Sequence, residues 1–562
     1  MPENNGPSRA PGILWPRVLP AALVLLFAAQ CAWFIHTQSL TADEPFHIQS
    51  GLDGWRHGQF KERDDNPPLA RLWFTVLIRG PEFQIIKPQG RPVQAIEPSP
   101  EDLLWRARGM NVLLGAALAI AVWCAARRFF STAAANFALA LFALSPALVT
   151  HFSLTTHDGP VTLVIFLAAL QLARWRANPS RLEVAVLGVA LGVMLVTKHN
   201  AAAMFALALL LVLLLRREGW SANPLRWNWK AAVLVTLVAG LVVWGSYFFH
   251  VSRVELHNGT LTMTFPNWDT PFVRPVPLSV NTTLYIPAGE YFTGIFRVAQ
   301  NSRHGFESYL LGKNYHGGKR HFFPMVMVLK WPPLILLLAA TGGLLMLLRK
   351  ASRPAGVGLI LLFPALYFAM AVMSNMNFGD RHILPVYPFL LLLAAGVWEF
   401  ARQRQSRALM AGVALVVALQ AADTARYAPD YLTYFNPLIE PAESYKYLTD
   451  SNLDWGQGLI ALREYERAHP DETIHLAYFG NALPQSVYGI RARPLHDGEY
   501  PSGTIVVGAR HLSGYTHKER WNYHWVERFP RKTILGHVLH LFEVREGPEL
   551  QELRSQAAES RK

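Results

Sequence analysis

Apolar blocks of about 20 residues recur along this chain and decide most of what it can fold into, because a helix of that length crosses the hydrocarbon core of a bilayer. The chain has 562 residues, of which 51% are hydrophobic and only 16% are charged. A water-soluble core of this size needs no such blocks. We therefore predict a polytopic α-helical membrane protein. Eleven spans are predicted, at 17–37, 102–126, 132–150, 159–175, 183–198, 200–215, 231–250, 325–348, 355–373, 383–401 and 408–422.

Basic residues between the predicted spans indicate the orientation, because cytoplasmic loops collect Lys and Arg. Alternate links are rich in these residues, whereas the short links between them hold only Lys198 and Arg381. This pattern predicts a cytoplasmic N-terminus and places the loops 38–101 and 251–324 on the outer side. It also accounts for the net charge of +13. No compact basic cluster with interleaved aromatic residues indicates a nucleic-acid partner, so the predicted partner surface is the bilayer.

Composition divides the chain into three predicted parts. These are a cytoplasmic N-terminal tail (1–16), a transmembrane domain (17–422) and an extracytoplasmic segment (423–562). In the last part, the run QGLIALREYERAH has a helical pattern, and TIHLAYFG, TIVVGARHL and HVLHLFEVR are strand-like. The segment is therefore predicted to be a small α/β domain followed by a C-terminal tail.

The first outer loop is predicted to contain a helix on the membrane surface. Ile48, Leu52 and Trp55 recur at i, i+4 and i+7, the spacing of one helix face. On this prediction the polar residues of the same helix, His47, Asp53 and Arg56, turn away from the membrane.

Six ionisable residues at the predicted outer face are candidates for a site, because charges near a bilayer are costly unless paired or functional. The acidic ones are Asp43, Glu44 and Asp158, and the basic ones are Lys198, Lys330 and Arg381. Asp43 and Glu44 are neighbours and point in different directions, so different roles are expected. The alternatives are that the acidic pair solvates the exit of the first span, that Asp158 caps a helix and that Arg381 is an interfacial residue.

Several motifs occur in the same order as in a known family. They are TADEPFHIQSGLDGWRHGQF, DDNPPLARLW, THDGP, LVTKHNA, GKNYHGGKRHFFPMVMVLKWP and GDRHILPVYPFLLLLAAG. Together they resemble the bacterial polyprenyl-phosphate-dependent glycosyltransferases related to protein O-mannosyltransferases and aminoarabinose lipid A transferases. This is the membrane-embedded GT-C class, glycosyltransferase family 39-like.

The resemblance implies a role for each candidate residue. Asp43 matches the general base for the acceptor hydroxyl, and Glu44 and Asp158 match residues that orient the acceptor or, in some members, a metal. Arg381, Lys330 and Lys198 are assigned to the donor phosphate. Where the aminoarabinose transferases have a lysine before the paired prolines, this chain has Asn66.

The resemblance thus implies a glycosyltransferase that moves a sugar from a polyprenyl-phosphate carrier to a hydroxyl of a protein, lipid A or cell-envelope glycan. The expected location is the outer face of the inner (plasma) membrane, with inversion at the anomeric carbon. No nucleotide cofactor is expected, and the need for a divalent metal is left open. The alternatives are a transporter or flippase, with charges spread along paired halves of the bundle, and a membrane-anchored assembly or binding protein that acts through residues 441–562.

Overall fold

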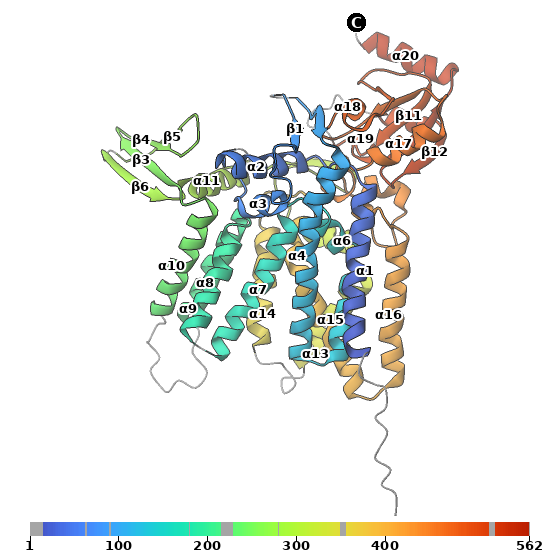
Figure 1. Cartoon of the computed structure of the whole chain (residues 1–562). Helices are drawn as coiled ribbons and strands as arrows, with labels where there is room; N and C mark the ends of the chain where they lie inside the picture. The colour runs from blue at the N-terminus through green and yellow to red at the C-terminus, as the bar shows by residue number, and fades with distance from the viewer. Residues whose placement is uncertain are drawn as a thin grey trace, which may run out of the picture.

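The computed structural model describes residues 15–61, 65–88, 91–178, 180–214, 229–278, 280–348, 356–515 and 523–560. Its long helices stand side by side in a bundle, and its sheets all lie beyond one end of that bundle, called the sheet end here (Figure 1). The predicted N-terminal tail up to residue 14 and the basic links 215–228 and 349–355 lie outside the described residues. The bundle helices are α1 (Trp15–Thr37), α4 (Pro100–Phe129), α5 (Thr132–Ala143), α7 (Asp158–Ala177), α8 (Arg181–Leu195), α9 (Ala202–Leu214), α10 (Trp229–Ser246), α13 (Pro333–Leu348), α14 (Val357–Val372), α15 (Tyr387–Gln403) and α16 (Arg407–Ala425).

Six helices in the described part of the chain are long and apolar enough to cross a membrane, or eight if each of two bent pairs forms one span. The chain is thus a polytopic membrane protein, but the predicted number of eleven spans is not confirmed. Helices do occupy the remaining predicted positions, yet α8, α9 and α14 have only 15, 13 and 16 residues. The predicted hairpin in 183–215 corresponds to α8 and α9, which are separated by the short 3-10 turn His199–Ala201.

Close packing of α8 against α10 depends on two glycines one helical turn apart. A Cβ added at Gly188 would lie 2.8 Å from the Cβ of Val238, and one added at Gly192 would lie 2.7 Å from the Cβ of Val242. Small residues at this spacing let helix backbones approach closely within a membrane. On the opposite side of α10, Leu237 is 66% exposed, as expected for a side chain that faces lipid.

The predicted span 325–348 is broken. Helix α12 (Phe322–Lys330) meets α13 at a bend of 115°, because Pro332 and Pro333 interrupt the backbone hydrogen bonds that would continue the helix. Lys330 is the last residue of α12 and therefore lies at the bend that breaks the predicted span. A second bend, of 66°, separates α5 from α6 (Pro146–Phe152).

Helices α2 (Glu44–His57) and α3 (Leu69–Thr75) lie across the sheet end of the bundle (Figure 1). Ile48 and Leu52 are buried as their spacing predicts. His47 is also buried, however, so the prediction that it turns away is wrong. The reason is that protein covers α2 on more than one side. An added Cβ at Gly51, for example, would collide with the carbonyl of Arg71 in α3.

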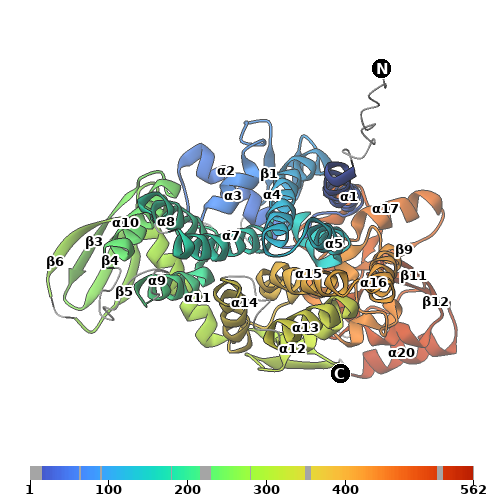
Figure 2. The same ribbon diagram turned by 90° about the horizontal axis from the view of Figure 1, so that it is seen from below.

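Two sheets project from the sheet end, one at each end of the molecule's long axis (Figure 2). The first is antiparallel, with the order β5-β4-β3-β6, and is followed by α11 (Gly289–His304) and the hairpin β7 (Glu307–Leu310) and β8 (Lys313–His316). Its strands are β3 (Val251–His257), β4 (Thr260–Thr264), β5 (Phe272–Pro275) and β6 (Thr282–Pro287). A small pair, β1 (Gln84–Ile86) and β2 (Ala95–Glu97), precedes α4.

The second sheet belongs to the C-terminal segment 423–562, called the tail from here on, and has the order β10-β9-β11-β13-β12. The three segments with strand patterns are β9, β11 and β13, and the helical run is α17. β11 pairs in parallel with β9 and antiparallel with β13, so the tail is an α/β unit. Its elements are α17 (Leu459–Ala468), β9 (Ile474–Ala477), α18 (Pro484–Tyr488), β10 (Arg493–Pro494), β11 (Gly503–Gly508), α19 (Ala509–Leu512), β12 (Arg531–Leu535), β13 (Leu539–Val544) and α20 (Pro548–Ser560).

Candidate active site

A cavity of about 650 Å³ opens at the sheet end of the bundle. Four of the six candidate residues line it, although they come from four separate parts of the chain. Asp43 directly precedes α2, Asp158 begins α7, Lys198 follows α8, and Arg381 lies in the 3-10 turn Asp380–Val386 before α15. The wall also includes His47, Asn66, His157, Tyr367 and His382.

The four charged side chains form one alternating network. Lys198 Nζ lies 2.5 Å from Asp158 Oδ1. Arg381 Nη1 lies 3.3 Å from Asp43 Oδ2 and 3.8 Å from Asp158 Oδ2. The Asp158 side chain is 3% exposed, whereas that of Asp43 is 25% exposed. Asp158 is therefore held between two cations, and Asp43 is the more exposed of the two cavity carboxylates.

The local sequence explains why Asp158 is available for these contacts. The N-cap of α7 is His157, not Asp158, and its side chain makes no capping bond. Asp158 therefore does not serve as the cap that was one alternative for it. The next residue, Gly159, packs against α6, where an added Cβ would lie 2.9 Å from the carbonyl oxygen of His151. This close approach keeps the start of α7 at the cavity wall.

Histidines lie beside the charged network in the cavity wall, at positions 47, 157, 199 and 382. Burial lowers the pKa of His157 well below its ordinary value, and the nearby His47 and Arg71 lower it further. The rings of His47 and His157 meet edge to face with centroids 4.6 Å apart. Burial therefore disfavours the charged form of His157 in the cavity wall.

The Asp158 carboxylate does not fit the role of a metal ligand, because a cation lies beside each of its oxygens. Among the described residues, no group of three or more His, Cys, Asp or Glu side chains is arranged to hold a metal ion.

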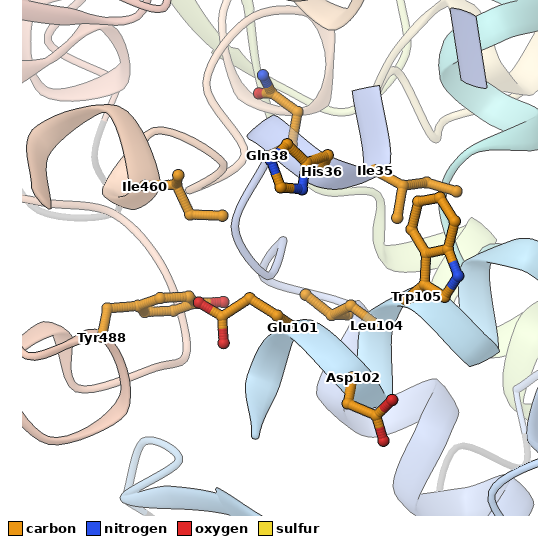
Figure 3. A pocket seen from close by; sticks show the side chains of 9 residues that line it. All are labelled: Ile35, His36, Gln38, Glu101, Asp102, Leu104, Trp105, Ile460 and Tyr488. Atoms are coloured by element: carbon orange, nitrogen blue, oxygen red, sulfur yellow. The ribbon is translucent and has the colours of Figure 1, made fainter. Parts of the chain in front are cut away.

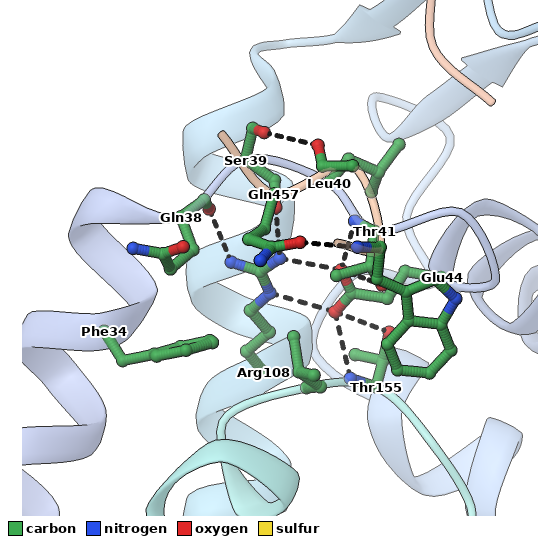
Figure 4. A network of polar contacts seen from close by, with 12 residues as sticks. Phe34, Gln38, Ser39, Leu40, Thr41, Glu44, Arg108, Thr155 and Gln457 are labelled. Atoms are coloured by element: carbon green, nitrogen blue, oxygen red, sulfur yellow. Dashed lines mark hydrogen bonds and ion pairs between the residues drawn. The ribbon is translucent and has the colours of Figure 1, made fainter. Parts of the chain in front are cut away.

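Glu44 does not line the cavity, which corrects its assignment to the acceptor. Its side chain is fully buried and forms a two-pronged ion pair with Arg108 of α4, with N–O distances of 2.9 and 2.7 Å. Backbone and hydroxyl groups of Thr41 and Thr155 donate to the same carboxylate (Figure 4). Both oxygens are therefore fully used in joining α2, α4 and the segment before α7.

Lys330 also lies away from this cavity. Its ammonium group donates to the carbonyls of Leu432 at 2.8 Å and Asn452 at 2.6 Å. The side chain is buried, and it lines a separate space of only about 10 Å³. The bend between α12 and α13 turns Lys330 toward the chain that leads into the tail, so its position does not match a contact with the donor phosphate.

A further cavity of about 250 Å³ lies between α1, α4 and the tail (Figure 3). Its wall contains Glu101 and Asp102, but Glu101 pairs with Arg463 at 2.8 Å and Asp102 pairs with Arg106. The six candidate residues are not among those that line it.

Sequence reasoning missed Trp455, which belongs to the tail. Its ring lies under the guanidinium of Arg381, 4.2 Å from the ring centroid to Cζ. Trp455 lies in the run DSNLDWGQGL, 74 positions after Arg381 in the sequence. Nothing in the sequence pattern predicts that these two residues meet.

Comparison with known proteins adds one sequence match. A family model described as dolichyl-phosphate-mannose-protein mannosyltransferase matches residues 101–244. Among curated protein sequences, none matches the chain.

Several solved structures are similar in outline. ArnT from Cupriavidus metallidurans bound to undecaprenyl phosphate is 12% identical, with a TM-score of 0.46 over 94% of this chain and 98% of that one. The Pmt1-Pmt2 protein O-mannosyltransferase complex of S. cerevisiae is 11% identical, with a TM-score of 0.46 over 84% and 96%. The oligosaccharyltransferase AglB from Archaeoglobus fulgidus is 12% identical, with a TM-score of 0.45 over 88% and 70%. Because all three TM-scores lie below 0.5, these similarities define neither the fold nor the activity of this chain.

The family match covers α4 to α10 and includes two of the four charged cavity residues, Asp158 and Lys198. This match agrees with the family resemblance shown by the ordered motifs in the sequence. Residues 101–244 are therefore similar to the dolichyl-phosphate-mannose-protein mannosyltransferases, and this similarity supports a membrane glycosyltransferase.

Proposed function

We propose that this protein transfers a sugar from a polyprenyl-phosphate carrier to a hydroxyl group of an acceptor in the cavity at the sheet end of the bundle. The acceptor oxygen attacks the anomeric carbon and forms the new glycosidic bond. The bond from that carbon to the phosphate oxygen breaks, and the polyprenyl phosphate leaves with the bonding electrons. Attack from the side opposite the leaving phosphate inverts the anomeric configuration.

One observation carries the proposal: Arg381 lies between Asp43 and Asp158 in the wall of one cavity, with Lys198 beside Asp158. A guanidinium presents several N–H groups in a plane that matches phosphate oxygens. Arg381 and Lys198 can therefore stabilise the charge that develops on the leaving phosphate. Because the proposed donor carries a polyprenyl phosphate, undecaprenyl phosphate is a suitable probe of this site.

Asp43 is the proposed general base. It is the more exposed of the two carboxylates, and its contact with Arg381 is 3.3 Å long. When the donor phosphate engages Arg381, Asp43 can turn to the acceptor hydroxyl and accept its proton as the new bond forms. Asp158 has a positioning role, because it holds Lys198 at 2.5 Å and lies close to Arg381.

The proposed location is the outer face of the plasma membrane, with the N-terminus cytoplasmic and the tail extracytoplasmic. The distribution of Lys and Arg among the links supports this topology, and the sheets and the cavity share one end of the bundle (Figure 1). The acceptor is proposed to be a protein, lipid A or cell-envelope glycan. A transporter would place its charged residues along a path through the bundle, whereas these four lie together at one end.

The test compares cells that lack the gene with cells rescued by the wild type, by Asp43→Asn or by Asp269→Asn. Asp269 is an exposed carboxylate between β4 and β5, so it receives the same substitution away from the cavity. Loss of general-base catalysis lowers a rate by about 10²–10⁴-fold. We expect Asp43→Asn to leave the glycan missing and Asp269→Asn to restore it, as measured by mass spectrometry of glycolipids and glycoproteins. Full restoration by Asp43→Asn would show that the assigned base is wrong.

A further inference from the structure

The tail segment 449–457 lies against the loop that carries Asp43. Two backbone groups of that loop donate to it: Ala42 N to the carbonyl of Trp455 at 2.9 Å, and Ser39 N to the carbonyl of Gln457 at 3.0 Å. The Ser39 hydroxyl adds a bond to the carbonyl of Gly456 at 3.0 Å. The residue next to the proposed base is therefore fixed by the tail.

The same segment also holds the loop that carries Arg381. The side chain of Asn452 accepts from Asp380 N at 3.0 Å and donates to the carbonyl of Phe378 at 2.8 Å. Between these two residues, Gly379 comes so close that an added Cβ would lie 2.9 Å from Ser451 Oγ. Segment 449–457 thus bonds to the residues directly before Asp43 and directly before Arg381.

Contacts within the tail fix the shape of this segment. The buried carboxylate of Asp454 accepts from Gly456 N at 3.2 Å and from Arg510 N at 3.0 Å. Gly456 has a φ of +92°, a backbone conformation that favours glycine. The guanidinium of Arg510 forms an ion pair with Asp450 and lies 3.6 Å from the ring centroid of Phe479. Trp455 is therefore presented by a rigid turn.

We infer that segment 449–457 is a brace across the site and that Trp455 is a positioning residue that holds Arg381 for the donor phosphate. This inference rests on the proposed function and extends it to the tail. The guanidinium carbon of Arg381 lies over the Trp455 ring, 4.2 Å from its centroid, and an aromatic face attracts such a cation. A phosphate binds the N–H groups at the edge of the guanidinium plane. Both contacts can therefore exist together, and the ring keeps Arg381 from turning fully toward its two acidic neighbours.

The experiment measures the affinity of the full-length protein in detergent for undecaprenyl phosphate, the carrier without a sugar. We expect Trp455→Ala to weaken binding by roughly 3- to 30-fold, the range for a cation–aromatic contact. Trp455→Phe retains an aromatic face and should recover most of the affinity. In an Arg381→Ala background, Trp455→Ala should have no further effect, because the residue acts through Arg381.

Trp525→Ala is the matched control. Trp525 packs against Tyr500 and Phe529 inside the tail, so its loss should lower the melting temperature while leaving the affinity unchanged. An equal loss of affinity in Trp525→Ala and Trp455→Ala would show a general effect of tail stability and overturn the inference. So would a loss from Trp455→Ala that persists in the Arg381→Ala background.

The same measurements separate this inference from the proposed function. If Arg381→Ala weakens binding and Trp455→Ala does not, the brace is overturned and the proposed donor stands. If the wild-type protein does not bind undecaprenyl phosphate, the proposed donor is overturned and the inference falls with it.

Discussion

Asp43 and Glu44 are adjacent in the sequence, yet the fold gives them opposite surroundings. Glu44, the first residue of α2, is fully buried, and Arg108 and two threonines donate hydrogen bonds to its two oxygens (Figure 4). Asp43 faces a cavity and has a 3.3 Å contact with Arg381. Protein groups surround both oxygens of Glu44, whereas Asp43 and Arg381 have room for a ligand beside them. Two ion pairs of similar composition therefore have different roles, one structural and one suited to chemistry.

The sealed pair shows how protein contacts can outweigh burial. Burial by itself would raise the pKa of Glu44, but the charge of Arg108 and the hydrogen bonds from Arg108, Thr155 and Thr41 lower it. Glu44 therefore stays ionised with its partner inside the protein. Removing only one member of such a pair is costly, because the remaining charge is buried without compensation.

The largest expected effect breaks the sealed pair. Arg108→Met should reduce the free energy of unfolding by about 3–5 kcal/mol, measured by thermal or denaturant unfolding in detergent. The double variant Arg108→Met with Glu44→Met should regain much of this loss, since no buried charge remains. Asp43→Asn should change stability by at most about 1 kcal/mol, the value for a partly exposed pair. A similar loss for Arg108→Met and Asp43→Asn would remove the distinction between the two pairs.

An intermediate effect tests whether Lys330 has a structural role, as Glu44 does, or binds the donor phosphate. Lys330→Met leaves the carbonyls of Leu432 and Asn452 without their buried donor, at a cost of about 1–3 kcal/mol in unfolding free energy. The affinity for undecaprenyl phosphate should fall at least tenfold less than in Arg381→Ala. If Lys330→Met weakens that binding as much as Arg381→Ala, the residue serves the donor phosphate after all.

At neutral pH the smallest effect concerns His540 in β13, a buried ionisable group whose ring nitrogens have no hydrogen-bond partner in the described structure. Burial, with a smaller contribution from Arg531, lowers its pKa to about 3. The unfolded chain takes up a proton below about pH 6.5, whereas the folded tail does so only near pH 3. The stability should therefore fall by up to about 1.4 kcal/mol per pH unit as the pH drops through this window.

His540→Leu removes that proton uptake from the unfolded state. Its unfolding free energy should depend less on pH than that of the wild type between pH 6.5 and 4.5, as measured by unfolding curves at several pH values. Parallel curves for the two proteins would contradict the role of His540. Glu44 and His540 can then be compared. Burial beside Arg108 keeps the Glu44 carboxylate charged, whereas burial without a hydrogen-bond partner favours the neutral His540 ring.

Local patterns in the sequence predict much of the fold. The apolar blocks coincide with helices, the spacing of Ile48 and Leu52 matches the buried face of α2, and the strand-like runs of the tail are β9, β11 and β13. The predictions fail where contacts come from distant parts of the chain. His47 is covered by the segment around His157, and the bend after Lys330 sends its side chain to Leu432 and Asn452.

The sequence by itself determined that this chain forms a membrane bundle and that Asp43, Asp158, Lys198 and Arg381 belong to one end of it, because hydropathy and the charge of short links are local properties. Only the tertiary structure decided that these four charges meet in one cavity and that Glu44 and Lys330 instead make structural contacts. Glu44 finds Arg108 64 residues away, and Arg381 finds Trp455 of the tail. Such partners are set by packing in three dimensions. Two adjacent carboxylates can therefore differ completely: Glu44 is buried against Arg108, and Asp43 faces the cavity.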